Sequence, residues 1–273
     1  MAHALRVMTR ELFFYNASTG TCAAGRLSTD GNFTGLTTGG GLSPWTHVAA
    51  VGRELFFYNA SSGACAAGRL STDGNFTGLT TGGGLSTDWT HMDAVGRELF
   101  FYNASTGACA AGRLSTDGNF TGLTTGGGLS TDWTHMDAVD RELFFYNAST
   151  GACAAGRLST DGNFTGLTTG GGLSTDWTHM DAVDRELFFY NASTGACAAG
   201  RLSTDGNFTG LTTGGGLSTD WTHMDAVGRE LFFYNASTGA CAAGRLSTDG
   251  NFTGLTTGGG LSTGWTHVVA VTG

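Results

Sequence analysis

Apolar and polar positions along the chain form short runs of strand length, separated by turns rich in Gly, Asn, Asp, Ser and Thr. In one representative stretch the four runs are residues 89–95, 98–103, 108–114 and 120–125. Aromatic and β-branched residues suit a pleated surface, so each run is a predicted β-strand. Residues 96–97, 104–107 and 115–119 are predicted turns, and residues 126–132 form the longest connection. No segment has a 3.6-residue apolar period, so we expect no helix.

This pattern recurs six times. The string Leu-Phe-Phe-Tyr begins at Leu12, Leu55, Leu99, Leu143, Leu187 and Leu231, with a spacing of 43 residues once and 44 thereafter. The copies differ at few positions. Such identity implies recent amplification or deliberate design.

Six four-stranded units, each needing a partner on both faces, close most simply into a ring. We therefore predict an all-β fold: a single six-bladed β-propeller of four-stranded antiparallel blades spanning residues 1–273, with about 44 residues per repeat. A β-helix is the main rival, but its repeats are usually shorter. A trefoil needs three repeats.

The two ends of the chain offer two ways to close the ring. Residues 265–271 form a full copy of the first strand of a unit, and we expect them to join the strands of the first unit and remove an exposed sheet edge. The alternative is that residues 4–9, a poorer copy, fill that place.

Composition and charge narrow the class of protein. The chain has 47 glycines, one proline (Pro44), 40% hydrophobic residues and a net charge of −9 without any lysine. It is too apolar for a disordered chain, and its glycines lack the collagen period. No basic stripe or long apolar run is present, so we expect neither nucleic-acid binding nor membrane insertion. We also expect no cofactor.

One cysteine recurs in each unit, on a strand away from the ring axis. Equivalent atoms of neighbouring blades lie too far apart there for disulfides, so we expect six buried free thiols. Free thiols and the lack of a signal peptide favour the cytoplasm. Each unit also has Asn-Ala-Ser and Asn-Phe-Thr, which match the glycosylation pattern but are more simply interpreted as turn residues.

Two motifs resemble known propellers. Trp-Thr-His before an apolar strand, followed by Leu-Phe-Phe-Tyr-Asn and a Thr-Gly turn, resembles the repeats of tachylectin-like and bacterial or fungal propeller lectins. This resemblance covers every unit and implies carbohydrate binding. Ser115-Thr-Asp-Gly-Asn-Phe120 resembles a contracted Asp-box of sialidase-like propellers, which implies a structural turn.

The candidate sugar sites lie at the end of the ring that carries the longest loops. An aromatic face can cover a pyranose while carboxylates and amides bind its hydroxyls. The predicted carbohydrate-binding residues are Asp88, Trp89, Asp132, Trp133, Asp176, Trp177, Asp220, Trp221, Asn59, Asn103, Asn147 and Asn191. The equally weighted alternative for the tryptophans is packing between blades. The expected partners are glycans on multivalent surfaces, bound by a monomer.

Other recurring polar residues have simpler interpretations. His91 and Asp93 point to one face of their strand and could line the axis, but one such pair per blade is no metal-ligand set, so we predict no metal site and favour hydrogen-bonded histidines between blades. Arg97 and Glu98 are interpreted as solvated turn charges or weak ion pairs.

The repeats bear on three classes of function. Near-identical units offer the same groups six times, and no nucleophile–base pair is evident, so we expect that the chain is not an enzyme. A multivalent lectin with shallow sites between blades fits the repetition, since several weak sites gain avidity. The alternative is a designed or recently amplified symmetric scaffold without a natural ligand.

Overall fold

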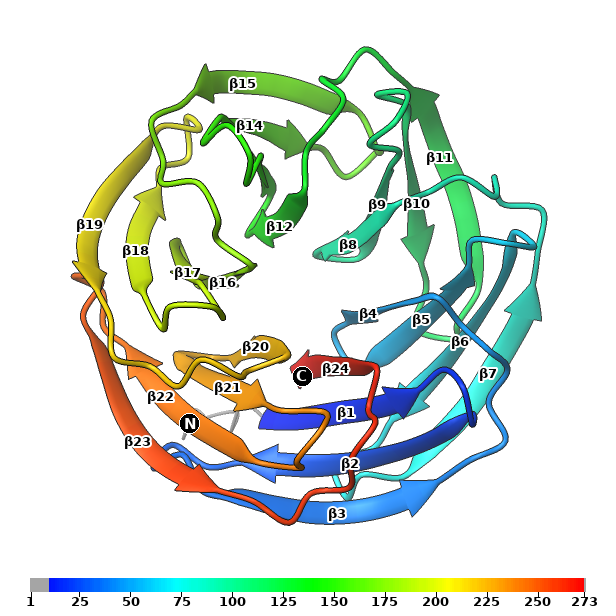
Figure 1. Ribbon diagram of the computed structural model, residues 1–273. Helices are drawn as coiled ribbons and strands as arrows, with labels where there is room; N and C mark the ends of the chain where they lie inside the picture. The colour runs from blue at the N-terminus through cyan, green and yellow to red at the C-terminus, as the bar shows by residue number, and fades with distance from the viewer. Residues whose placement is uncertain (1–9, 273) are drawn as a thin grey trace, which may run out of the picture.

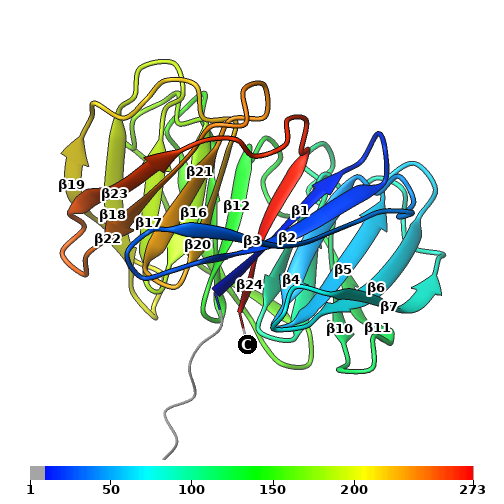
Figure 2. The same cartoon turned by 90° about the horizontal axis from the view of Figure 1, so that it is seen from below.

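The computed structural model describes residues 10–272 and confirms a six-bladed β-propeller of four-stranded antiparallel blades. The blades surround a central channel (Figure 1), and the strands of each blade run between the two ends of the ring (Figure 2). No helix occurs among the described residues. Hence nothing in this part of the chain is an apolar helix long enough to cross a bilayer.

Each blade contributes one strand to each of four concentric layers. The innermost strands are β4 (His47–Val51), β8 (His91–Val95), β12 (His135–Val139), β16 (His179–Val183), β20 (His223–Val227) and β24 (His267–Thr272). The second strands are β1 (Arg10–Asn16), β5 (Glu54–Asn59), β9 (Glu98–Tyr102), β13 (Glu142–Tyr146), β17 (Glu186–Tyr190) and β21 (Glu230–Tyr234). The third strands are β2 (Thr21–Leu27), β6 (Ala64–Leu70), β10 (Cys109–Leu114), β14 (Cys153–Leu158), β18 (Cys197–Leu202) and β22 (Cys241–Leu246). The outermost strands are β3 (Phe33–Gly39), β7 (Phe76–Gly82), β11 (Phe120–Gly126), β15 (Phe164–Gly170), β19 (Phe208–Gly214) and β23 (Phe252–Gly258).

Blade 1 contains both ends of the described chain. Its strand order is β24-β1-β2-β3, and blades 2 to 6 follow in sequence from β4 to β23. Strand β24 pairs antiparallel with β1, with Phe13 opposite Val269. The chain therefore closes the ring through its C-terminal strand. The alternative closing segment, residues 4–9, lies outside the described residues.

The apolar core lies between blades and not within them. At the boundary of blades 3 and 4, one buried cluster combines Phe100 and Tyr102 of one blade with Phe145 of the next. Ala111, 3% exposed, belongs to the same cluster, and its small side chain leaves room for these rings. The same arrangement recurs at the other boundaries and explains why the second strands are apolar on both faces.

The third and outermost strands of a blade fit together around a glycine. The register between β10 and β11 shifts at Ala111/Gly112, which marks a bulge. A Cβ at Gly112 would lie 2.1 Å from the ring of Phe120. The ring therefore occupies the space that a side chain would need, and Gly112 is required for this close approach.

The Asp-box-like turn after β10 is a structural turn. Asn119 donates its backbone N–H to Ser115 Oγ at 2.9 Å and its side-chain amide to Asp117 Oδ2 at 2.8 Å. Hydrogen bonds, first that from Ser115, lower the pKa of Asp117. The turn is thus held by its own side chains.

The prediction that Arg97 and Glu98 are solvated charges or weak pairs was wrong for the glutamate. Glu98 is 2% exposed and binds Arg113 of its own blade at 2.8 Å and Arg141 of the next blade at 2.5 Å. Every blade repeats this arrangement, and Arg10 completes it by pairing with Glu230. The sequence places Glu98 beside a turn, but only the ring brings the second arginine to it. We call this set of pairs the Glu–Arg belt.

Candidate functional site

The tryptophans lie in the packing between blades. Trp133, Trp177 and Trp221 are 8–9% exposed, and Trp89 is half-buried. Trp133 packs on Phe145, with the ring centroids 6.0 Å apart, inside the cluster between blades 3 and 4. The predicted strand that begins at Trp89 begins instead at His91. The indoles of Trp133, Trp177 and Trp221 are thus largely covered by the packing between blades, whereas that of Trp89 is only half-buried.

The asparagines of the predicted sites hold the loops in place. Asn103 donates its side-chain amide to the carbonyl of Asp88 at 2.7 Å. Its Oδ1 accepts the backbone N–H groups of Ser105 and Thr106 at 2.9 and 3.1 Å. Asn59, Asn147 and Asn191 make equivalent bonds. These amides are therefore committed to backbone groups.

The four predicted aspartates remain exposed at the end of the ring that carries the long loops. They are Asp88, Asp132, Asp176 and Asp220. Asp132 and Asp176 have left-handed backbone conformations, with φ of 77° and 75°. The structure therefore brings the Asp, Trp and Asn of each predicted site close together. Of the three side chains, only the aspartate carboxylate faces solvent.

Repeated pockets lie elsewhere, between the outer parts of neighbouring blades. Four have volumes of about 170–200 Å³ and equivalent linings, at the boundaries of blades 3/4, 4/5, 5/6 and 6/1. The 3/4 pocket is lined by β10 and the end of β11 on one side and the β14–β15 turn on the other. The lining residues are Phe100, Cys109, Ala110, Thr124, Thr125, Gly126, Gly127, Leu129, Gly162, Asn163 and Phe164. We call these the interblade pockets.

The interblade pocket combines an apolar floor with a polar rim. Phe100 and Phe164 contribute rings with centroids 5.2 Å apart. Thr124 Oγ1 donates to the carbonyl of Gly162 at 2.6 Å and so ties the two walls together. Asn163 is exposed beside them. Sequence reasoning missed this pocket; its signal was the run of small residues Thr124 to Gly127, which leaves space beside a strand.

The six cysteines are free and buried, as predicted. Burial raises the pKa of each thiol, for example that of Cys109. Four of them line interblade pockets. They act there as small apolar groups.

The histidines at the starts of the innermost strands link neighbouring blades, as expected. His91 Nε2 lies 3.2 Å from the carbonyl oxygen of Thr134 in the next blade. A carbonyl oxygen only accepts, so Nε2 carries the proton. Burial lowers the pKa of His91, which favours the neutral ring. His267 bonds to Thr46 and so continues this series across the closure.

The central channel contains a cavity of about 430 Å³ lined by residues of all six innermost strands. Four blades contribute Asp93, Asp137, Asp181 and Asp225. Burial raises the pKa of each, and that of Asp181 rises to about 7. Among the described residues, no three His, Cys, Asp or Glu side chains converge to hold a metal ion.

One known protein family matches the repeated unit of this chain. The family model described as "Histone H3 K4-specific methyltransferase SET7 N-terminal" matches residues 7–54, 49–82, 92–126, 135–170, 179–214 and 224–259. The chain belongs to this SET7 N-terminal family. The matches follow the repeats, one after another, so membership describes the repeated unit of the ring and assigns no reaction to it. No curated protein sequence matches the chain.

Solved structures share the fold of this SET7 N-terminal family member at low sequence identity. A protein from Lactobacillus plantarum is 15% identical, with 97% of this chain and 99% of that chain covered and a TM-score of 0.62. The periplasmic gluconolactonase of Pseudomonas aeruginosa is 14% identical, with the same coverages and a TM-score of 0.60. A putative 6-phosphogluconolactonase from Bacteroides fragilis is 12% identical, with coverages of 95% and 84% and a TM-score of 0.59.

These comparisons correct the expectation that the chain is not an enzyme. Solved structures of similar fold include proteins named as gluconolactonases, so the repeated fold alone does not exclude an enzyme. The physical reason lies in the channel. Near-identical units do offer the same groups, but they converge on one axial cavity, where Ala49 and Val269 stand in place of two of the aspartates. Repetition therefore does not exclude an asymmetric site.

Proposed function

We propose that this propeller is a multivalent carbohydrate-binding protein, with one saccharide ring held in each interblade pocket. The observation that carries the proposal is the recurrence of one pocket of about 170–200 Å³ at successive blade boundaries. One water occupies about 30 Å³ of liquid, so the pocket has room for a ligand the size of about six waters. A single sugar ring is of that order.

The chemistry of the lining also suits a sugar. Phe164, which is half-buried, offers apolar surface for the C–H face of a ring, while the exposed Thr125 and Asn163 offer hydroxyl and amide groups for its hydroxyls. The lining has no charged side chain, which favours a neutral ligand. This placement differs from the predicted sites around the tryptophans, whose faces are largely covered. The exposed aspartates of those sites remain a second possible location, and the test below separates the two.

The affinity of one pocket should be poor. A small polar ligand in a shallow pocket buries little surface, so a dissociation constant of about millimolar to micromolar is expected. Several equivalent pockets on a rigid ring then gain avidity on a surface that carries many copies of the sugar.

The test is a glycan array together with isothermal titration of simple monosaccharides. In the pocket variant, Gly127 and its five equivalents are changed to Ala. A Cβ at Gly127 would lie 3.7 Å from its nearest neighbours, so the variant should fold. One added methyl in a tight pocket should weaken binding by about tenfold or more.

Two control variants locate the site. Changing Gly122 and its equivalents to Ala adds the same methyl on the outermost strands, five residues before the pocket glycine, where nothing lies within 4 Å, and should leave binding intact. Changing Asp88, Asp132, Asp176 and Asp220 to Asn tests the exposed aspartates at the end of the ring that carries the long loops. Loss of binding in this aspartate variant alone would place the sugar site at these aspartates. If no glycan on a broad array binds, the alternative of a symmetric scaffold without a natural ligand is favoured instead.

One further ligand belongs in the panel. Since some solved structures of similar fold are named as gluconolactonases, gluconolactone should be tested for binding and for acid release in a pH-stat. Hydrolysis that survives the pocket variant but stops when channel aspartates are replaced would assign turnover to the axis.

A further inference from the structure

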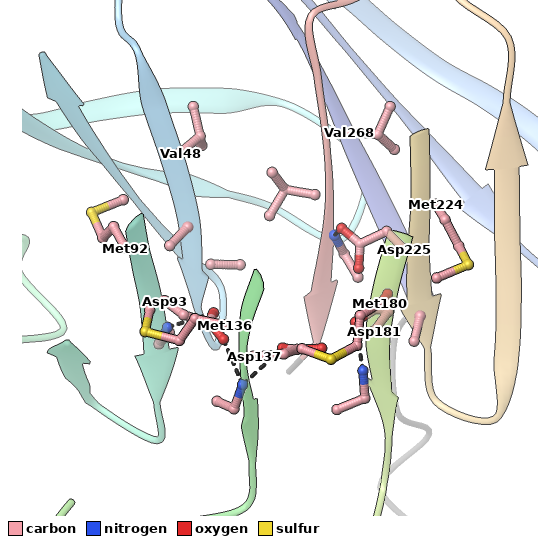
Figure 3. Close-up of a pocket in the computed structure, with 18 residues that line it drawn as sticks. Val48, Met92, Asp93, Met136, Asp137, Met180, Asp181, Met224, Asp225 and Val268 are labelled. Carbon is pink, nitrogen blue, oxygen red and sulfur yellow. Dashed lines mark hydrogen bonds between the residues drawn. The ribbon is translucent and has the colours of Figure 1, made fainter. Parts of the chain in front are cut away.

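The residues that line the central channel differ between the repeats. In four consecutive blades the innermost strand contributes Met-Asp-Ala, as in Met92 to Ala94. The two adjacent strands β4 and β24 contribute Val48-Ala-Ala50 and Val268-Val-Ala270 instead. The cavity therefore has an arc of carboxylates on one side and a wall of small apolar side chains on the other (Figure 3).

Part of each carboxylate has a structural task. The aspartates accept backbone N–H groups at the inner edges of the strands: Asp93 binds the amides of Ala94 and Ala138, both at 2.7 Å. Asp225 likewise accepts the amide of Ala270 in the next blade at 2.9 Å. These bonds fix the carboxylates against the channel wall.

Two carboxylate oxygens are left over. Asp137 Oδ2 and Asp181 Oδ2 are buried and accept no hydrogen bond. Asp137 and Asp181 stand on neighbouring strands, and Figure 3 shows their side chains close together in the channel. A buried carboxylate oxygen without a donor is costly, so this pair of oxygens calls for a cationic or protonated donor.

The protein supplies no such cation. No Arg lines the cavity, and the strands that flank β12 bring only Asp93, Asp181 and the histidines His91 and His179, whose pKa values are lowered by burial. The pKa of Asp137 is raised by burial, then by the charges of Asp181 and Asp93. These carboxyl groups therefore hold protons at low pH, and no cationic side chain lines the cavity to balance them once they ionise. No three of the groups in the arc converge as metal ligands.

We propose that the axial cavity binds one primary alkylammonium ion, with its ammonium group between Asp137 and Asp181 and its alkyl chain on the wall formed by β4 and β24. An ammonium offers three N–H donors, enough for both free oxygens. The volume of about 430 Å³ falls in the range of small-molecule sites. This site is independent of the interblade pockets, and its stoichiometry is one per ring.

Binding is coupled to protons. The cation needs ionised carboxylates, so it competes with the protons that Asp137 and Asp181 hold at low pH. Affinity should therefore rise as the pH rises through about 7, the pKa of Asp181, and binding should release protons.

The test uses n-hexylammonium chloride as the probe, with isothermal titration and thermal melting at pH 5.5 and pH 8. We expect one site per chain, tighter binding at pH 8, and heats that depend on the ionisation enthalpy of the buffer. n-Hexanol, which has the same chain without the charge, should not bind. Equal binding of hexanol, or no signal from millimolar hexylammonium at pH 8, would overturn the proposal.

Matched variants locate the ammonium. Asp137→Asn with Asp181→Asn should weaken binding at pH 8 at least tenfold. Asp132→Asn with Asp176→Asn removes the same charge from the exposed rim of the same two blades and should change affinity less than twofold. If both variants lost the same affinity for hexylammonium, the protein's overall negative charge would attract the cation without a defined site, and the proposal would be wrong. The comparison of hexylammonium with hexanol needs no variant and decides the case should the channel variant not fold.

Discussion

Arg10, the first residue of β1, forms an ion pair with Glu230, the first residue of β21, and this contact completes the Glu–Arg belt around the ring. Each glutamate of the belt receives one arginine from its own blade and one from the next. The belt therefore links the blades at every boundary, including that between blades 6 and 1, where the ring closes.

Removal of one belt glutamate should be costly. Glu98→Ala leaves Arg113 and Arg141 without their partner, and breaking a buried ion pair typically costs about 3–5 kcal/mol. Both arginines are partly exposed, so we expect the lower end, about 3 kcal/mol. Urea denaturation measures the free energy of unfolding. A loss under about 1 kcal/mol, the usual value of a surface pair, would show that the belt is energetically a set of surface pairs.

The exposed aspartate of the β12–β13 turn should matter far less. Asp140 stands where three other repeats have Gly52, Gly96 and Gly228; it has φ of 57° and pairs with Arg185 at 3.1 Å. Asp140→Gly relieves the left-handed conformation but removes an exposed pair, and the two effects oppose each other. The free energy of unfolding should change by less than about 1 kcal/mol. A larger loss in the same urea experiment would mean that the exposed pair contributes to the belt.

The channel aspartates should make stability depend on pH. Their folded-state pKa values lie above those of an unfolded chain, so the folded state binds more protons and its stability falls as pH rises from about 4 to 7. In Asp137→Asn the amide group can donate to Asp93 and Asp181 at every pH. This variant should melt higher than the parent at pH 8, with a smaller difference at pH 5.

The histidines act in the opposite direction, because their pKa values are lowered by burial and their contribution is lost as pH falls below about 6.5. They are common to both proteins, so the difference between the parent and Asp137→Asn isolates the carboxylates. A difference in melting temperature that is the same at pH 5 and pH 8 would contradict the assignment.

The closing strand should be indispensable. Deletion of residues 265–273 removes β24 from blade 1, together with Trp265 from the cluster between blades 6 and 1. We expect a loss of several kcal/mol, a large share of a typical stability, and association through the exposed edge of β1. Size-exclusion chromatography and thermal melting test this. A monomer with an unchanged melting temperature would show that another segment fills the place of β24.

The thiols should be unreactive in the folded ring. All six cysteines are buried, and burial raises their pKa values, so little thiolate forms. Titration with a thiol reagent should detect few groups in the native protein and six after denaturation. Several fast-reacting native thiols would mean that the interblade pockets open widely in solution.

The fold could be predicted from the sequence because its information is local and repeated. The Asp-Gly turns, the Leu-Phe-Phe-Tyr strands and the six copies suffice to give four-stranded blades and their number. The strand ends were predicted less accurately. Trp89 lies before its strand and packs in the cluster between blades 2 and 3. The local sequence pattern cannot indicate a contact of this kind between blades.

The candidate sites were harder to predict for the same reason. Trp133, Asp132 and Asn147 have the chemistry of a sugar site, but the backbone of the loop already uses the amide of Asn147 and the core covers the indole. The interblade pocket joins Thr124 of one blade to Gly162 of the next. Such a pocket depends on the angle between blades, which no spacing within one repeat encodes.

The pairing of β24 with β1 also sets the order in which the molecule can be completed during synthesis. Strands β1 to β3 leave the ribosome first, but their blade lacks its innermost strand until the last residues of the chain emerge. The first blade made is thus the last one finished. Throughout translation, the nascent chain must keep the inner edge of β1 from pairing with any of the five similar strands that emerge before β24.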